Sequence, residues 1–189
     1  YRGVHLTAIL SKTCEKLTGG PIMDHLENSG AWGDTQFAFR KRHGAKDVLA
    51  LFTAKLVLAL EHRLKVGIYL GDIAGAVDRV FSEFLSGKFS KHGLHGKARA
   101  FMDCYFEPRK AVVLVGGEQS QQIPLVNQVF QGTVLGPPAW NTYFSDITNS
   151  VTESSFHDVK YADDLTAFKT FPDYFPNEEI LTEISECQK

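Results

Sequence analysis

The stretch Phe156–Phe168, FHDVKYADDLTAF, decides the fold of this 189-residue chain. Apolar and polar residues roughly alternate on both sides of Asp163 and Asp164, as they do in half-buried strands. Two such strands with a short polar stretch between them predict a tight β-hairpin that carries both aspartates at its tip. Adjacent carboxylates repel each other, and a bound divalent cation removes that cost. Because Mg²⁺ takes oxygen ligands, the tip is a candidate metal site, although a solvated acidic turn has the same local pattern.

A second candidate carboxylate lies in the run Val66–Ile73, VGIYLGDI. Its apolar residues predict a short buried strand with Asp72 at the C-terminal end, where chemistry is placed in α/β-type folds. The residues that follow predict a helix through about Leu85, and this helix contains Asp78. We expect Asp72 to point into a cleft and Asp78 to be structural.

Two loops carry further candidate residues. Asn127–Pro138, NQVFQGTVLGPP, holds two glycines and two prolines around the pair Gln131–Gly132, and such a loop lets backbone approach a ligand closely. The residues after it, Ala139–Ser150, predict a helix. Upstream, Gln36–Gly44, QFAFRKRHG, sets three consecutive basic residues beside two aromatic ones. This pattern fits a phosphate-contacting loop and a plain basic loop about equally well.

Helical and strand patterns predict most of the remaining elements. We expect a helix over Val4–Leu17 that ends at Gly19-Gly20-Pro21, and a largely buried helix over Ala45–Lys65 that ends at Gly67. Two further helices are expected over Leu94–Phe106 and Asn177–Gln188. A hairpin is expected to pair Ala111–Val115 with Gln122–Val126.

The composition is that of a globular chain, with 43% hydrophobic and 22% charged residues. The net charge is only −2, so nucleic-acid binding must rest on local basic patches. The most apolar run, Val48–Leu60, is too short to span a bilayer. The three cysteines are widely spaced and predict neither disulfides nor a metal site, so we expect an intracellular location, in the nucleus or the cytoplasm. The chain begins at Tyr1, and we expect it to be a segment of a longer protein.

Taken in order, these stretches resemble motifs of reverse transcriptases, especially those of non-LTR retrotransposons. The resemblance covers about residues 1–171. YRGVHLTAILSK (1–12) and QFAFRKRHG (36–44) resemble two fingers motifs, GDIAGAVDRV (71–80) the first aspartate motif, FQGTVLGPPAWN (130–141) the Gln-Gly substrate-pocket motif, and YADD (161–164) the second aspartate motif.

The resemblance implies an α+β right-hand polymerase fold, with fingers and an antiparallel palm sheet backed by helices but no thumb. Residues 1–66 would form the fingers and part of the palm, and residues 67–189 the palm with the catalytic aspartates. Asp72, Asp163 and Asp164 would be catalytic and would bind two Mg²⁺ ions, which Mn²⁺ could replace. The implied reaction is template-directed nucleotidyl transfer, with an RNA template, a DNA primer and dNTPs as partners and no role for a membrane.

The same resemblance implies a set of substrate-binding residues. Gln131 and Gly132 would border the incoming nucleotide and the template, Tyr161 would pack near the primer end, and Arg2, Arg40 and Lys41 would contact the triphosphate or the template. Val77 stands where the family usually has an aromatic residue that blocks a 2′-hydroxyl, which leaves the sugar selectivity open. Gly136 stands where many relatives have serine.

Two alternatives stay open at this point. One is a catalytically inactive retroelement remnant with at most nucleic-acid binding, which Val77 and the early C-terminus favour. The other is a group II intron-type reverse transcriptase. A viral RNA polymerase fits less well, because the Gln-Gly loop occurs together with Tyr-Ala-Asp-Asp.

Overall fold

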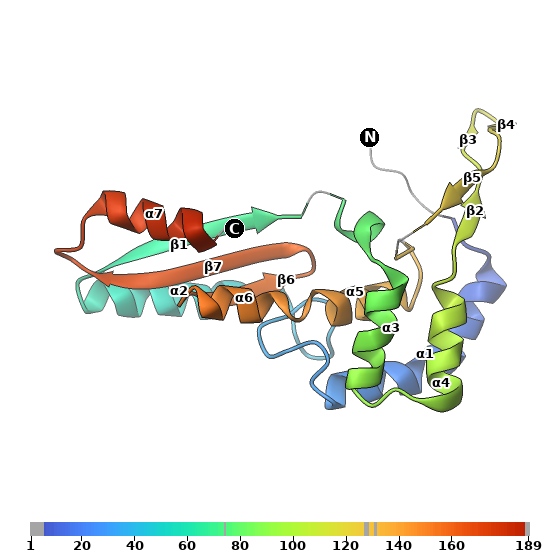
Figure 1. The fold of residues 1–189 in the computed structure, drawn as a ribbon, viewed down its shortest axis with the longest axis horizontal. Helices are drawn as coiled ribbons and strands as arrows, with labels where there is room; N and C mark the ends of the chain where they lie inside the picture. The colour runs from blue at the N-terminus through green and yellow to red at the C-terminus, as the bar shows by residue number, and fades with distance from the viewer. Residues whose placement is uncertain (1–5, 74, 127–128, 131, 188–189) are drawn as a thin grey trace. The chain divides into compact units, whose positions relative to one another are not determined.

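The structure, a computed structural model, describes residues 6–73, 75–126, 129–130 and 132–187 (Figure 1). The chain forms two compact units, each built from two separate stretches. Residues 1–31 and 75–143 form the first, which we call the helical unit, and residues 32–74 and 144–189 form the second, the sheet unit. Helices and antiparallel strands occur in both, which confirms the α+β class. The predicted division into fingers and palm at residues 66/67 stays a prediction.

The sheet unit is built on three antiparallel strands in the order β1-β7-β6. Strand β1 spans Leu64–Asp72, β6 spans His157–Tyr161 and β7 spans Asp164–Pro172. The predicted hairpin around the paired aspartates is confirmed as β6 and β7, joined by the two residues between them. The predicted strand that ends at Asp72 is also confirmed and is longer than expected.

Helices cover both faces of this sheet. Helix α2, Ala45–Glu61, packs on one face, where the ring of Phe52 lies edge-on to Phe168 with 5.5 Å between the ring centroids. The next residue along β7, Lys169, points to the other face and forms an ion pair with Glu183 of α7, Asn177–Cys187. Figure 1 shows α2 and α7 on opposite sides of β1 and β7. This alternation is the two-residue period of a strand, and it fixes which side chains share a face.

Two expectations about α2 are wrong. The helix ends at Glu61 rather than near Gly67, because Arg63 adopts a positive φ of 52° and turns the chain into β1. Gly67 instead lies inside β1, where a Cβ atom would stand 3.1 Å from Cγ2 of Ile180 on α7. Within the described chain α2 is also far from buried, since Leu60 is 70% exposed. The helix is apolar on most faces but lies against the sheet along one side.

The helical unit contains four α-helices among its described residues, together with one 3₁₀ turn and two short strand pairs. They are α1 Ile9–Asn28, η1 Ala76–Arg79, α3 Ser82–Lys91, α4 Gly96–Tyr105 and α5 Gly136–Phe144, with β2 Arg109–Ala111 paired to β5 Ile123–Leu125 and β3 Leu114–Val115 paired to β4 Glu118–Gln119. The predicted helix over 94–106 is confirmed as α4. The predicted hairpin forms as two short ladders, but its inner pairing differs from the prediction, since Leu114 and Val115 pair with Gln119 and Glu118 and not with residues 122–126. Leu26, Leu85 and Met102 are fully buried in the core of this unit.

Helix α1 continues through Gly19, Gly20 and Pro21, where we expected it to end. The buried face of α1 explains this difference, because Glu15, Gly19, Ile22 and Leu26 recur at helical spacing. At Gly19 a Cβ atom would stand 2.7 Å from Cδ2 of Leu135, so the glycine permits close packing. This burial outweighs the one helical hydrogen bond that Pro21 removes.

Two other helices differ from expectation in their limits. The predicted helix over 139–150 is two helices, α5 and α6 (Ile147–Glu153), because the chain breaks at Ser145-Asp146, residues that favour turns and caps over helix interiors. After β1 the chain makes only the 3₁₀ turn η1 before α3 begins at Ser82. None of the described helices combines the length and hydropathy that a bilayer crossing requires. All three cysteines are free thiols.

Candidate active site

The register of the sheet brings the predicted aspartates to one end of it. Asp72, the last residue of β1, lies directly opposite Asp164, the first residue of β7. Directly opposed residues of an antiparallel pair point to the same face, with Cβ atoms about 5 Å apart. Asp163 precedes Asp164 in the turn between β6 and β7. The backbone therefore brings Asp72 and the distant pair Asp163-Asp164 to the same end of the sheet.

The accessibility and chemistry of these carboxylates suit a hard cation. Asp72 and Asp164 are exposed and Asp163 is half-buried. Mg²⁺ is typically bound through one or two carboxylates while it keeps several waters, and these oxygens are donors of that kind. Within the described part of the chain, no three or more His, Cys, Asp or Glu side chains already converge on a metal position. The oxygen chemistry of this donor set is the kind that Mg²⁺ prefers.

Tyr161 lies beside the aspartates. It is the last residue of β6 and pairs with Asp164 across the hairpin, so the two side chains lie on the same face. Its side chain is 37% exposed. The ring is thus available to a ligand that approaches the carboxylates.

The turn itself has an unusual backbone. Ala162 adopts a positive φ of 58°, a left-handed conformation that is costly for a residue with a Cβ atom. Non-glycine residues in such conformations persist where the surroundings hold them. Here the side chain of Gln36 bonds both the N–H and the C=O of Ala162.

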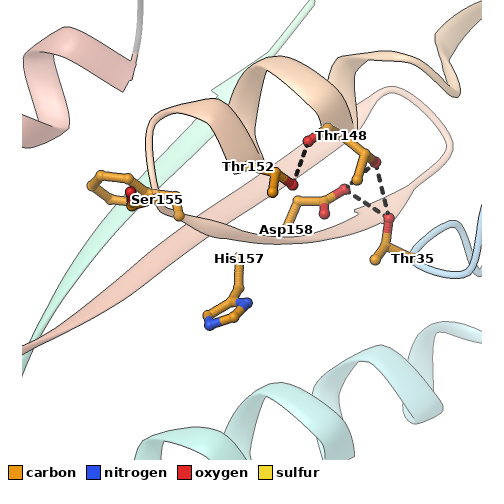
Figure 2. Close-up of a pocket in the computed structure, with 7 residues that line it drawn as sticks. Thr35, Thr148, Thr152, Ser155, His157 and Asp158 are labelled. Atoms are coloured by element: carbon orange, nitrogen blue, oxygen red, sulfur yellow. Dashed lines mark hydrogen bonds between the residues drawn. The ribbon is translucent and has the colours of Figure 1, made fainter.

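A buried ion pair with its hydrogen-bond partners lies in β6, just before the turn. Lys160 is fully buried and Asp158 nearly so, with 3.4 Å between Lys160 Nζ and Asp158 Oδ2. The hydroxyls of Thr35 and Thr148 each donate to the same carboxylate oxygen at 2.7 Å, and Lys160 Nζ donates to Thr148 Oγ1 at 2.5 Å. Figure 2 shows Thr35 and Thr148 converging on Asp158. These interactions connect the loop that contains Thr35, helix α6 and strand β6.

A hollow of about 340 Å³ lies over this network and is lined by residues of α6, of β6 and of the connection between them, together with Thr35. In Figure 2 the side chain of Asp158 points toward α6, whereas His157 points the opposite way, as expected for neighbours in a strand. The carboxylate of Asp158 already accepts two hydroxyl hydrogen bonds, so it serves the fold of the sheet unit rather than a ligand.

Sequence analysis missed three residues that support the site: Gln36, Asp158 and Lys160. No local pattern marks Gln36, because its amide acts on Ala162, far along the chain. A signal was available for the other two: Asp158 and Lys160 stand two apart in a strand and therefore share a face. Two opposite charges at such positions in a buried hairpin indicate an internal ion pair.

The basic residues that were predicted to contact the triphosphate or the template differ in their exposure. Arg40 is half-buried, and its Nη1 donates to the carbonyl oxygens of Gly33 at 2.8 Å and Gln36 at 3.1 Å. Lys41 is exposed, and its carbonyl oxygen contacts the ring of His43. Arg40 thus holds the backbone of its own loop, and both residues belong to the sheet unit. Arg2 lies outside the described residues.

The Gln-Gly loop belongs to the helical unit, and a hydrogen bond to helix α1 holds it in place. Gln131 lies outside the described residues, whereas Gly132 is exposed with a positive φ of 75°. The buried carboxylate of Glu15, on α1, accepts a hydrogen bond of 2.6 Å from the N–H of Val134. Val77 lies in η1, also in the helical unit, and its side chain is outside the described part.

Gly136 closes this loop tightly. A Cβ atom there would stand 2.7 Å from Thr133 Oγ1 and 2.8 Å from the carbonyl oxygen of Phe130. The N–H of Gly136 donates to Thr133 Oγ1, which in turn donates to that carbonyl. In this chain the loop conformation therefore has no room for a serine at position 136.

Tyr105 lies under the same loop, and burial raises its pKa to about 12; Glu15 adds to this rise in the pKa, whereas Thr133 acts against it. The unfolded phenol ionises near pH 10, so between about pH 10 and pH 12 the folded state holds a proton that the unfolded state loses. Stability is therefore expected to fall as the pH rises through this window.

Urea unfolding at about pH 9 and about pH 11 tests this expectation. The stability of the wild type relative to Tyr105→Phe should fall between the two values, because phenylalanine cannot ionise. Tyr174→Phe is the control, since it makes the same chemical change at a tyrosine that is 85% exposed. An unchanged Tyr105→Phe difference would contradict the assignment.

Comparisons with known proteins place the chain among polymerases. The family model described as reverse transcriptase (RNA-dependent DNA polymerase) matches residues 1–189. The chain is 32% identical over 170 residues to an RNA-directed DNA polymerase from the mobile element jockey of Drosophila melanogaster, which covers 87% of this chain and 18% of that protein. A jockey polymerase of Drosophila funebris is 30% identical over the same shares. A probable RNA-directed DNA polymerase from transposon BS of Drosophila melanogaster is 28% identical over 149 residues, 78% of this chain and 16% of that protein. The chain thus spans less than a fifth of the length of these relatives.

Proposed function

Because the chain belongs to the reverse transcriptase family, we propose that it is the catalytic segment of an RNA-directed DNA polymerase of a retrotransposon, with Asp72, Asp163 and Asp164 as the acidic centre. The observation that carries the proposal is the register of β1 against β7. It sets Asp72 opposite Asp164 at the same end of the sheet as Asp163, although the two strands lie far apart in the sequence. In this assignment the sheet unit corresponds to the palm.

The proposed reaction is an in-line displacement. The oxygen of a primer 3′-hydroxyl attacks the α-phosphorus of a dNTP, the bond to the bridging oxygen breaks, pyrophosphate leaves and the hydroxyl loses its proton. Two divalent cations, Mg²⁺ or Mn²⁺, would supply charge neutralisation on the phosphate oxygens and a lowered pKa for the attacking hydroxyl. Asp72, Asp163 and Asp164 would hold them through carboxylate oxygens.

The other predicted residues would orient substrates around this centre. Tyr161, on the same face as Asp164, would support the primer end. Gln131 and Gly132 would border the nucleotide and the template, with the loop kept in place by Glu15. Lys41 is the exposed basic candidate for the triphosphate or the RNA template. Arg2 and Arg40 are further candidates, although Arg40 also holds its own loop.

A catalytically inactive remnant with at most nucleic-acid binding remains the second candidate. The observation that favours it is Val77, in place of the expected aromatic residue. The sheet geometry weighs against it, because all three aspartates still lie at one end of an intact sheet. A group II intron-type enzyme would share the same centre, and the relatives from mobile elements favour the retrotransposon type.

Primer extension on an RNA template with Mg²⁺ and dNTPs tests the proposal. The chain alone and the chain followed by a reverse transcriptase thumb would each be compared with their Asp163→Ala versions. Asp173→Ala is the matched control, an exposed aspartate at the far end of β7. We expect extension that the Asp163→Ala change abolishes and the Asp173→Ala change leaves intact. Folded protein without extension in either form would favour the remnant.

A further inference from the structure

Gln36 is a buried amide that reaches the tip of the aspartate hairpin. Its side chain is 2% exposed, although it lies in a loop. Oε1 accepts hydrogen bonds of 3.0 Å from the N–H groups of both Ala38 and Ala162, and Nε2 donates to the carbonyl oxygen of Ala162 at 3.1 Å. Two N–H donors on one atom identify it as the amide oxygen, so the orientation of the amide follows from its partners.

The backbone on either side of Gln36 is fixed to the same hairpin. Residue 36 forms a parallel bridge with Lys160, in which Lys160 N–H donates to Thr35 O at 2.8 Å and Phe37 N–H donates to Lys160 O at 3.0 Å. The guanidinium of Arg40 donates a hydrogen bond to the carbonyl oxygen of Gln36. The backbone of Gln36 is therefore held against the hairpin, and this defines where its amide lies.

The amide acts on the residue of the turn whose backbone is strained. Ala162 keeps a φ of 58° with both of its backbone polar groups bonded to one side chain. Asp163 is the next residue, and Asp164 follows at the start of β7. Because neighbouring residues share a peptide plane, fixing Ala162 limits the directions in which Asp163 can project.

We propose that Gln36 is a positioning residue, which sets the Ala162 turn so that Asp163 and Asp164 present their carboxylates to a divalent cation together with Asp72. The inference rests on the proposed function, since it requires these aspartates to bind metal. A purely structural Gln36 would stabilise the hairpin without affecting metal affinity.

Three variants of the chain separate these two roles. Gln36→Met keeps the length and bulk of the side chain and removes all three amide hydrogen bonds. Gln36→Asn keeps the amide but is one methylene shorter, so it cannot reach both groups of Ala162. Ile180→Ala is the control, because Ile180 lies on α7 of the same unit, is buried against β1, and its truncation lowers stability without touching the hairpin tip.

Two measurements on each folded variant give the readouts. Hydrogen exchange of the Ala162 amide reports whether the hydrogen bonds between Gln36 and Ala162 are intact, and the exchange should become at least about tenfold faster in both Gln36 variants. Titration with Mn²⁺, followed by its effect on the NMR relaxation of the turn residues, reports affinity. We expect the Mn²⁺ concentration for half-saturation to rise by about tenfold in the Gln36 variants and to stay at the wild-type value in Ile180→Ala.

Each outcome decides the inference. Faster exchange with weakened Mn²⁺ binding in Gln36→Met or Gln36→Asn supports it. Wild-type Mn²⁺ affinity in the Gln36 variants, or unchanged exchange at Ala162, overturns it and leaves the proposed function standing. A wild-type chain that binds no Mn²⁺ shows instead that the proposed function has failed, and the inference falls with it.

Discussion

Asp72→Asn is expected to reduce primer extension by about a thousandfold or more, which corresponds to about 4 kcal/mol of lost transition-state stabilisation. Asparagine keeps the shape and one oxygen of the side chain but removes its charge, and the charge is what holds a divalent cation beside phosphates. Asp72 is exposed at the end of β1, so its replacement does not disturb the core. The thermal unfolding midpoint should therefore change little.

Steady-state extension on an RNA template, with kcat and the dNTP KM determined separately, provides the measurement. The loss should fall on kcat and should be accompanied by a higher Mg²⁺ requirement. Asp173→Asn is the matched control, because Asp173 is an exposed aspartate just beyond the other end of β7. A Asp72→Asn protein within a few-fold of wild type would remove Asp72 from the catalytic centre.

Lys160→Met is expected to destabilise the chain by about 3–5 kcal/mol, the usual cost of breaking a buried ion pair from one side. Lys160 is 0% exposed, and its ammonium group is the positive partner of the buried Asp158 carboxylate. Without it, Asp158 keeps the two hydroxyl donors of Thr35 and Thr148 but no compensating charge. Methionine fills the same space, so the loss reflects the missing ammonium group, with its charge and hydrogen bonds, rather than a cavity.

Urea unfolding of Lys160→Met, Asp158→Leu and the double variant gives the measurement. The double variant should be less destabilised than the sum of the two single changes, because it leaves no unpaired charge in the sheet unit. Lys169→Met is the control, since the Lys169–Glu183 pair is partly exposed and should contribute about 1 kcal/mol or less. A loss below about 1 kcal/mol in Lys160→Met would contradict the assignment of a buried, energetically coupled pair.

The hairpin and the strand that ends at Asp72 could be predicted because local alternation determines them. Side chains of a strand alternate between faces, so the pattern around Asp163 and Asp164 carries its own structural information. The pairing of Asp72 with Asp164 required the register, which depends on contacts between β1 and β7 that no local pattern encodes. The resemblance to a known family, and not the spacing, predicted that these residues belong together.

Helix limits were harder to predict, because packing overrides local signals. Pro21 is a strong helix breaker by itself, yet α1 passes through it since the helix buries a continuous face that includes Leu26. The opposite error occurred at Ser145-Asp146, where an apolar helical pattern concealed the break between α5 and α6. Gln36 shows the same limit for the site, because its amide bonds a residue 126 positions away.

Paramagnetic broadening by Mn²⁺ tests whether Asp72, Asp163 and Asp164 share a metal, because it reports whether one bound ion lies beside both strand ends. Mn²⁺ would be added to the isotopically labelled chain in increments, with the backbone amide signals followed by NMR. We expect signals around Asp72 and around Asp163 and Asp164 to broaden together at the lowest Mn²⁺ concentrations, and Asp72→Asn to weaken the effect at the hairpin. Broadening at only one of the two places, or an effect at the hairpin that Asp72→Asn leaves unchanged, would contradict a shared metal centre.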